Sequence, residues 1–399
     1  MARGLWQIVI ALILGILSTP MIKSFYFAAG HRWQYIFLYS FLAAYFVTPF
    51  CRLLALRLGI MDRPDWRKIH ENSTPLLGGI AVFVSFSVSL LLNGVFLPGM
   101  KVLLAGSTLI FLMGLFDDVR PLPALFKLCV QVLVSLLVIL WGDIQLTFFY
   151  HASFAALLNV PLTVLWLVGL TNAFNFLDGI DGLAASLSII TAFFLGVIAF
   201  NTNQPALGWF AIALIGACVG FMPHNFRFRE SALLFLGDAG STFLGFTLAG
   251  LAILGEWSTT SHFVSLSSPI LVFGVFIFDM VYVTLSRIKN RRSNSLLDIL
   301  ISPNKDHLHH RLIFMGFPRK EVVLIISTLC VCLGVSALII MNQKFIDAVL
   351  GLFQAVLILA LIVALMLRGR ERVDLQALGT PPASLQKGEC LRHDPARQR

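Results

Sequence analysis

The chain has 399 residues, of which 58% are hydrophobic and only 12% are charged, and its mean hydropathy is +0.87. A soluble globular domain carries about 25% charged residues, so this composition excludes an ordinary soluble fold and favours a lipid environment. The formal net charge is +9. Basic residues beside membrane spans account for such an excess, so no nucleic-acid partner is expected. Six cysteines are scattered without the spacing of a metal site or a disulfide framework.

Apolar stretches long enough to cross a bilayer, about 17 to 25 residues each, recur along nearly the whole chain. They predict an all-α, polytopic integral membrane protein with about 11 to 12 transmembrane helices. The first stretch follows Arg3 and also suits a signal peptide, but no small-residue cleavage site follows it, so we expect an uncleaved anchor. The stretches lie near residues 5–20, 35–55, 76–96, 102–116, 124–141, 155–170, 183–200, 206–222, 241–254, 269–285, 322–341 and 346–367.

Three regions are expected along the chain. Residues 1–30 form an N-terminal membrane anchor segment, residues 31–367 form one membrane domain, and residues 368–399 form a disordered cytoplasmic tail that is rich in Arg, Pro and Gln.

The distribution of basic residues predicts the orientation. With the N-terminus in the cytoplasm, only Lys23, Arg32, Lys101 and Lys344 fall on the outer side, and the other 25 of the 29 Lys and Arg residues fall on the inner side. The positive-inside rule favours this arrangement strongly. Nearly all unusual polar residues then lie in five inner loops, which predicts a polar site at the cytoplasmic face of the membrane.

Two adjacent acidic residues, Asp117 and Asp118, end one apolar stretch, and Lys127 lies inside the next. Neighbouring carboxylates repel each other and are costly at a membrane boundary, so a cation should compensate them. Lys127 could form a plain structural salt bridge, or the three residues could bind metal and phosphate.

The third inner loop is the densest polar segment of the chain. Asn172, Asn175, Asp178 and Asp181 recur every three residues, which places them on one side of a helical turn. Hard oxygen ligands of this kind suit Mg²⁺, which binds through one or two carboxylates together with substrate phosphates. The alternative is a turn that is rich in Asn and Asp for structural reasons.

The fourth inner loop leads through Phe235 to Asp238, which precedes another apolar stretch. Asp238 therefore suits either a helix cap or a metal ligand, and the two roles are compatible.

The fifth inner loop contains His307, His309 and His310, followed by Arg311. Three histidines in four residues suggest zinc, but no Cys and no HExxH pattern accompanies them. Histidine and arginine beside a carboxylate-bound Mg²⁺ fit phosphate recognition better. Asp279 lies inside the preceding stretch and is expected to orient Arg287, two turns further on.

The first inner loop carries Lys68 and His70 in a basic stretch, followed by Gly78 and Gly79. Attraction to anionic lipid explains the basic residues, whereas the glycine pair allows close approach of a ligand or a helix.

Together these motifs resemble those of the polyprenyl-phosphate N-acetylhexosamine-1-phosphate transferase family over roughly residues 35–367. The motifs are Asp62-Arg-Pro with Arg67-Lys68-x-His70, Pro-Leu-Leu-Gly-Gly, Asp117-Asp118, Asn172-Ala-Phe-Asn175-x-x-Asp178-Gly-x-Asp181-Gly, Leu236-Gly-Asp238-Ala-Gly-Ser, and His307-Leu-His309-His310. The last motif resembles the branch that uses UDP-activated N-acetylaminosugars, rather than the related translocase that handles UDP-MurNAc-pentapeptide.

The resemblance implies a role for each matching position. Asp117, Asp118 and Lys127 are implied as the catalytic group, with Lys127 contacting the diphosphate. Asp238 and Asn175 are implied as ligands of Mg²⁺, with Mn²⁺ as an alternative metal. The implied substrate-binding residues are Lys68, His70, Asn172, Asp178, Asp181, Phe235, His307, His309, His310 and Arg311.

The function implied is transfer of an N-acetylaminosugar-1-phosphate, with GlcNAc-1-phosphate preferred, from a UDP-sugar to undecaprenyl or another polyprenyl phosphate, with release of UMP. This reaction would be the first membrane step of a cell-surface polysaccharide such as O-antigen, at the bacterial inner membrane, by an enzyme that could be a homodimer. UDP-GalNAc, UDP-FucNAc and UDP-QuiNAc are alternative donors. A transporter or flippase is the alternative of another class, but we find no internal repeat and few charges at mid-membrane. An inactive membrane scaffold is disfavoured by the presence of every acidic motif.

Overall fold

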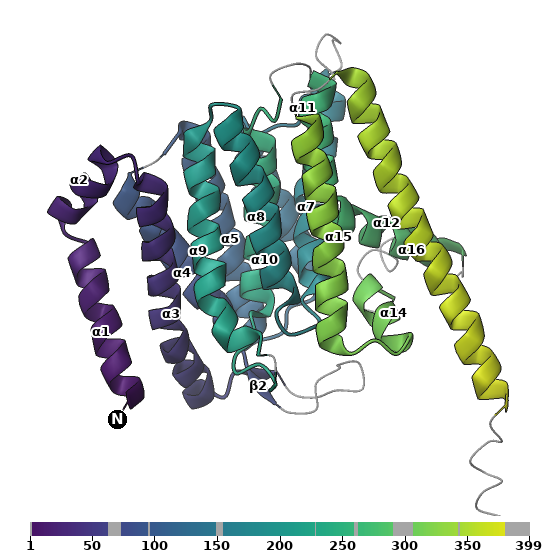
Figure 1. Cartoon of the computed structure of the whole chain (residues 1–399), viewed down its shortest axis with the longest axis horizontal. Helices are drawn as coiled ribbons and strands as arrows, with labels where there is room; N and C mark the ends of the chain where they lie inside the picture. Colours follow the sequence, from purple (N-terminus) through teal and green to yellow (C-terminus); the bar gives the residue numbers. More distant parts are fainter. Residues whose placement is uncertain are drawn as a thin grey trace, which may run out of the picture.

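The computed structural model describes residues 2–62, 73–94, 96–148, 155–227, 229–258, 262–289, 306–341 and 344–379. Within these ranges the chain forms a helical bundle with one two-residue antiparallel strand pair, β1 (Met61–Asp62) with β2 (Thr74–Pro75) (Figure 1). The helices are α1 (Ala2–Leu17), α2 (Pro20–Ala28), α3 (Arg32–Leu58), α4 (Gly78–Asn93), α5 (Pro98–Val119), α6 (Ala124–Gly142), α7 (Ala155–Leu177), α8 (Leu183–Asn201), α9 (Pro205–Asn225), α10 (Gly237–Leu254), α11 (His262–Val272), α12 (Gly274–Lys289), α14 (Leu308–Phe314), α15 (Arg319–Ile340) and α16 (Phe345–Gly379).

The prediction of an all-α protein with many membrane spans is confirmed. Nine of the described helices are long and apolar enough to cross a membrane, and the number rises to 11 when each of two bent helix pairs is counted as one span. The remaining predicted stretch corresponds to α4, an apolar helix of 16 residues. Every one of the twelve predicted stretches therefore coincides with a helix or a bent pair.

The stretch near 269–285 differs from its prediction as one continuous span. Two helices, α11 and α12, meet there at an angle of 74°. Gly274 begins the second helix beside α15, where a Cβ atom would lie only 2.7 Å from Leu333 Cδ1. Hydropathy reports the length of an apolar stretch and not its direction, so the bend is invisible in the sequence pattern.

Helix α10 is the centre of the bundle, and 83% of its residues are buried. Small residues let its backbone approach its neighbours closely. A Cβ atom on Gly79 of α4 would lie 2.4 Å from the Gly240 nitrogen, and one on Gly114 of α5 would lie 2.6 Å from the Asp238 carbonyl oxygen. The N-terminal turn of α10, with Asp238, is thereby fixed between α4 and α5.

The N-terminal helices α1 and α2 pack against α3 at one side of the bundle (Figure 1). Helices α1 and α2 meet at 67°. Lys23 Nζ donates to the Leu92 carbonyl oxygen, and Arg32 donates to the Asn93 carbonyl oxygen at 2.6 Å. These carbonyls end α4, where cations are favourable. Figure 1 shows α2 near one end of the bundle and β2 and α14 toward the other. Met61 and Asp62 of β1 and His310 of α14 line the same cavity as the predicted acidic site residues.

Candidate functional site

A cavity of about 1580 Å³ opens where α5, α6, α7, α10 and α14 meet. Eleven of the fifteen predicted site residues line it, namely Asp117, Asp118, Lys127, Asn172, Asn175, Asp178, Asp181, Phe235, Asp238, His307 and His310. His309 and Arg311 lie beside it in α14, and Lys68 and His70 lie outside the described residues. The cavity thus gathers motifs that are separated by almost 200 residues in the sequence.

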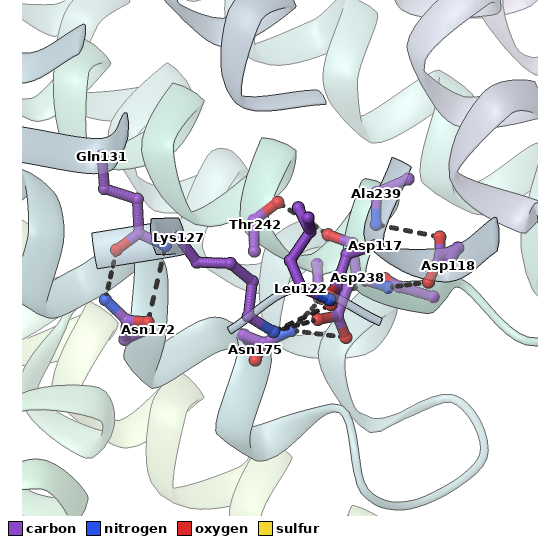
Figure 2. A network of polar contacts seen from close by, with 12 residues as sticks. Asp117, Asp118, Leu122, Lys127, Gln131, Asn172, Asn175, Asp238, Ala239 and Thr242 are labelled. Carbon is purple, nitrogen blue, oxygen red and sulfur yellow. Dashed lines mark hydrogen bonds and ion pairs between the residues drawn. The ribbon is translucent and has the colours of Figure 1, made fainter. Parts of the chain in front are cut away.

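Lys127 bridges two of the carboxylates at the polar end of the cavity. Its Nζ lies 2.8 Å from Asp117 Oδ2 and 3.0 Å from Asp238 Oδ2. Figure 2 shows the lysine between the two carboxylates. Asp117 Oδ1 also accepts the Leu122 backbone N–H at 2.6 Å, which fixes the turn between α5 and α6. The lysine therefore supplies the cation that the acidic pair was expected to need, and it takes Asp238 as its second partner.

Asp118 points away from Lys127 and toward the start of α10. Its two oxygens accept the backbone N–H groups of Asp238 at 2.8 Å and Ala239 at 3.1 Å (Figure 2). Helix N-termini leave such N–H groups without partners inside the helix. The expected helix cap is therefore provided by Asp118 of α5, and the side chain of Asp238 is directed to Lys127 and Asn175 instead.

Amide side chains of α7 connect the acidic centre to its surroundings. Asn175 Nδ2 donates to Asp238 Oδ1 and to Ser241 Oγ, both at 3.0 Å. One turn earlier, Asn172 Nδ2 donates to Gln131 Oε1 at 2.7 Å. Gln131 lies one turn after Lys127 on α6, so this amide pair holds the lysine-bearing helix against α7 (Figure 2).

Asp178 and Asp181 follow α7 in the loop that closes one side of the cavity. Burial, and then the nearby carboxylates of Asp238 and Asp118, raise the pKa of Asp178 well above its usual range. Asp181 Oδ2 accepts the Ala232 backbone N–H at 2.9 Å, which ties this loop to the one that precedes α10.

The three histidines at the start of α14, with His307 as the residue before the helix, have two kinds of setting. His307 and His310 line the cavity. His309 is fully buried behind them, and a Cβ atom on Gly179 would lie 2.5 Å from its Nε2. Burial, followed by the neighbouring His310 and His307, holds the pKa of His309 well below its usual range. The histidine motif therefore combines two residues at the cavity wall with one neutral packing residue.

Arg311 contacts its own loop and α12. Its Nε donates to the Asp306 carbonyl oxygen at 2.6 Å, and its guanidinium carbon lies 4.6 Å from the centre of the Tyr282 ring. The expected partner of Asp279, Arg287, contacts Asp306 at 3.4 Å, while both oxygens of Asp279 bond residues 307 and 308. The expectation that Asp279 orients Arg287 was therefore wrong. The loop before α14 returns to α12 and places His307 beside Asp279.

The oxygen-rich centre fits a hard divalent cation. Asp117 and Asp238 offer carboxylate oxygens, and the two donated bonds of Asn175 use its amide nitrogen and leave its amide oxygen for another partner. Among the described residues, no three His, Cys, Asp or Glu side chains form a complete metal site by themselves. Mg²⁺ does not require one, because it binds through one or two carboxylates together with water and substrate phosphates.

Two cavity residues were not identified from the sequence. Gln131 lies in the middle of an apolar stretch, where its polarity inside a span was an available signal. Arg319 begins α15 and lines the cavity, but nothing in its local sequence distinguishes it from other basic residues beside a span.

The comparisons with known proteins identify the family of the chain. Residues 100–256 match the model of glycosyl transferase family 4. The chain is 32% identical over 310 residues to the probable undecaprenyl-phosphate N-acetylglucosaminyl 1-phosphate transferase of Bacillus subtilis (strain 168), covering 76% of this chain and 84% of the relative. It is 31% identical to the decaprenyl-phosphate N-acetylglucosaminephosphotransferase of Mycobacterium tuberculosis (strain ATCC 25618 / H37Rv), covering 83% of this chain and 88% of the relative. It is 26% identical to the undecaprenyl-phosphate alpha-N-acetylglucosaminyl 1-phosphate transferase of Escherichia coli (strain K12), covering 73% of this chain and 78% of the relative. The chain therefore belongs to the polyprenyl-phosphate N-acetylhexosamine-1-phosphate transferase family.

Proposed function

We propose that the protein transfers N-acetylglucosamine-1-phosphate from UDP-GlcNAc to a polyprenyl phosphate and releases UMP. The observation that carries this proposal is the convergence of Asp117, Lys127, Asn175 and Asp238 at the polar end of a large cavity in a membrane protein. Both substrates are phosphate anions, so a site that holds a lysine among oxygen ligands suits their charges.

The shape of the cavity suits a lipid acceptor. Beyond Lys127 its walls follow α6 and α7 and become apolar, with Leu128, Val132 and Leu136 on one side and Val160 and Val164 on the other. A polyprenyl chain would lie along these residues while its phosphate reaches the polar end. The soluble nucleotide sugar would enter from the aqueous side.

The reaction requires a lipid phosphate oxygen to attack the β-phosphorus of the UDP-sugar. A bond forms between this oxygen and the β-phosphorus, and the bond from the β-phosphorus to the bridging oxygen breaks, so that UMP leaves. A phosphate monoester has its second pKa near about 6 and is largely ionised at neutral pH. The attacking oxygen therefore needs no strong base, and we assign Asp117 to positioning rather than to proton removal.

Lys127 would neutralise charge while the two anions approach each other, since Asp117 and Asp238 hold its ammonium group in place. Asp238, Asn175 and Asp117 are the residues that would hold Mg²⁺, which would supply further neutralisation of the diphosphate when bound. Asp178, Asp181, Phe235, Asn172 and the cavity-lining histidines would contact the substrates. For Lys68, His70, His309 and Arg311 the substrate-binding role stays a prediction.

We place the site at the cytoplasmic side of a bacterial inner membrane, because the cavity lies at the end of the bundle that the basic residues mark as the inner one. UDP-sugars are made in the cytoplasm, so the donor would reach the site directly. The pathway served is proposed to be a cell-surface polysaccharide.

The test is an assay of the purified protein in lipid nanodiscs with UDP-GlcNAc and undecaprenyl phosphate. The expected result is UMP release that requires the lipid acceptor and Mg²⁺ and stops when EDTA is added. Asp117→Asn should lose most turnover, and a variant with near-normal turnover would remove Asp117 from the chemistry. Movement of substrate across the membrane without UMP release would instead support a transporter. A panel of radiolabelled UDP-GlcNAc, UDP-GalNAc, UDP-FucNAc and UDP-QuiNAc would identify the sugar.

A further inference from the structure

A further buried acidic residue, Asp279, lies on the α12 side of the cavity. Asp279 is fully buried in α12, and both of its oxygens are used by the loop that leads into α14. Oδ2 lies 2.7 Å from His307 Nδ1, and Oδ1 accepts the Leu308 backbone N–H at 2.6 Å. The carboxylate therefore holds both the side chain of His307 and the backbone that follows it.

This bond determines which ring nitrogen of His307 is left for another partner. Asp279 occupies the Nδ1 side, so Nε2 is the nitrogen on the opposite side of the ring. The His307 side chain is 5% exposed, and among the described residues its Nε2 has no hydrogen-bond partner. Buried polar atoms normally have a hydrogen-bond partner. Since His307 lines the cavity, a substrate group bound there would supply one.

The ring is also held from a third direction. It stacks on Phe176 of α7, with ring centres 4.8 Å apart and an angle of 27° between the planes. Phe176 lines the same cavity as His307 and follows Asn175 directly. The orientation of Nε2 is therefore fixed relative to the acidic centre before any substrate arrives.

We propose that Asp279 is a positioning residue that acts through His307, and that the pair presents Nε2 as an acceptor to a hydroxyl or amide N–H of the UDP-sugar. This inference rests on the proposed function. An Nδ1–H donated to the carboxylate selects the tautomer in which Nε2 is a hydrogen-bond acceptor.

The simpler explanation is that Asp279 only caps the first turn of α14 through the Leu308 N–H. The two explanations differ in what an amide would do. In Asp279→Asn the side-chain oxygen can still accept the Leu308 N–H, while the amide nitrogen donates to His307 Nδ1, which moves the ring proton to Nε2 and turns that acceptor into a donor. A capping role would survive this change, whereas the proposed role would not.

The experiment measures kcat and KM for UMP release and the thermal unfolding of four proteins: Asp279→Asn, His307→Gln, the double variant, and the control Asp306→Asn. Asp306 lies in the same loop and contacts Arg287, so its variant tests general disturbance of the loop. For Asp279→Asn we expect kcat to fall by about a hundredfold, the scale of losing one preorganised hydrogen bond, with KM for the UDP-sugar changed by less than about threefold.

The decisive comparison is the double variant. If Asp279 acts through His307, the double variant should have nearly the same kcat as His307→Gln, because interacting residues are not additive. Multiplied losses, or an Asp279→Asn enzyme with wild-type kcat, would overturn the inference. An equal loss in Asp306→Asn would also overturn it, since the effect would then belong to the loop.

If Asp279→Asn does not fold, Phe176→Leu tests the same positioning from the other side of the ring. This variant keeps both bonds of Asp279, and we expect kcat to fall by about tenfold with unchanged thermal unfolding. An unchanged kcat would overturn the inference. If the wild-type protein releases no UMP, the proposed function fails and this inference fails with it, whereas an active wild type with fully active variants refutes the inference alone.

Discussion

Asp118 caps the helix that carries Asp238, because its Oδ1 accepts the backbone N–H of Asp238 at 2.8 Å across the interface between α5 and α10. The second oxygen accepts the Ala239 N–H at 3.1 Å. A carboxylate at a helix N-terminus is favoured by the helix dipole as well as by these bonds. Two residues of the acidic centre are thus linked through backbone, and Asp118 sets the position of Asp238 relative to Lys127.

Replacing Asp118 with Ala should lower both stability and turnover. The change removes two acceptors from the start of α10, and loss of a helix cap costs about 0.5–2 kcal/mol. The expected result is a lower melting temperature together with a large loss of UMP release. Asp117→Asn is the matched control, since it keeps the cap and should lose turnover with little change in melting temperature. Equal melting temperatures for Asp118→Ala and the wild type would contradict the capping role.

Replacing Gly237 with Ala should be more harmful than a comparable change elsewhere. Gly237 has a φ of +76°, and its Cβ would lie 2.5 Å from Asp118 Oδ2, so the variant would displace the cap as well as strain the backbone. Gly30 is the control, because it has a φ of +74° with nothing within 4 Å of a Cβ and does not line the cavity. Gly30→Ala should cost only the backbone strain, about 1–3 kcal/mol.

The measurement for this pair is thermal unfolding and UMP release in the same nanodisc preparation. Gly237→Ala should lose activity beyond what its stability loss explains, whereas Gly30→Ala should keep wild-type kcat. Two variants with the same kcat would show that contact with Asp118 is unimportant.

Replacing Lys127 with Met should reduce turnover by about a hundredfold or more, because the ammonium charge between Asp117 and Asp238 is lost. Lys127→Arg keeps the charge but cannot place a compact ammonium between the two oxygens, so partial activity is expected. Initial rates of UMP release at saturating substrates measure both variants. A fully active Lys127→Met enzyme would contradict the role of the lysine.

Replacing Asp178 with Asn should be tolerated better than replacing it with Leu. The raised pKa of Asp178 favours the neutral acid over a wider pH range than for an exposed carboxyl, and an amide resembles that neutral form. As the pH rises through the folded-state pKa, the wild-type carboxyl becomes charged while the amide does not. The rates of wild type and Asp178→Asn should therefore be similar at low pH and diverge at high pH.

Profiles of kcat/KM against pH for the wild type, Asp178→Asn and Asp178→Leu measure this prediction. If Asp178→Asn is as inactive as Asp178→Leu throughout the range, the charged carboxylate is the required form.

The sequence predicted the membrane helices well because burial in lipid imposes long apolar stretches, and each of the twelve stretches is helical in the structure. It also predicted that the motifs of α5, α6, α7 and α10 meet, since basic residues placed their ends on one side. The bend between α11 and α12 was not predictable, because a hydropathy pattern contains length and no direction.

The partners of several hydrogen bonds were also not predictable from the sequence. Asp118 bonds a helix start 120 positions away, and Asp279 bonds His307 rather than Arg287. Such choices depend on how non-adjacent helices pack, which local spacing does not encode. Gln131 was missed for the same reason, as its partner Asn172 lies on another helix.

The burial of α10 has a consequence for how the protein meets its membrane. This helix touches its neighbours through glycines at backbone distance, so other helices, and not acyl chains, are its surroundings. Changes in bilayer thickness act on lipid-facing helices such as α16, which can tilt to match them. Changes in the bilayer therefore act little on the site residues that α10 holds. We expect lipid composition to alter delivery of the acceptor more than the geometry at Asp238.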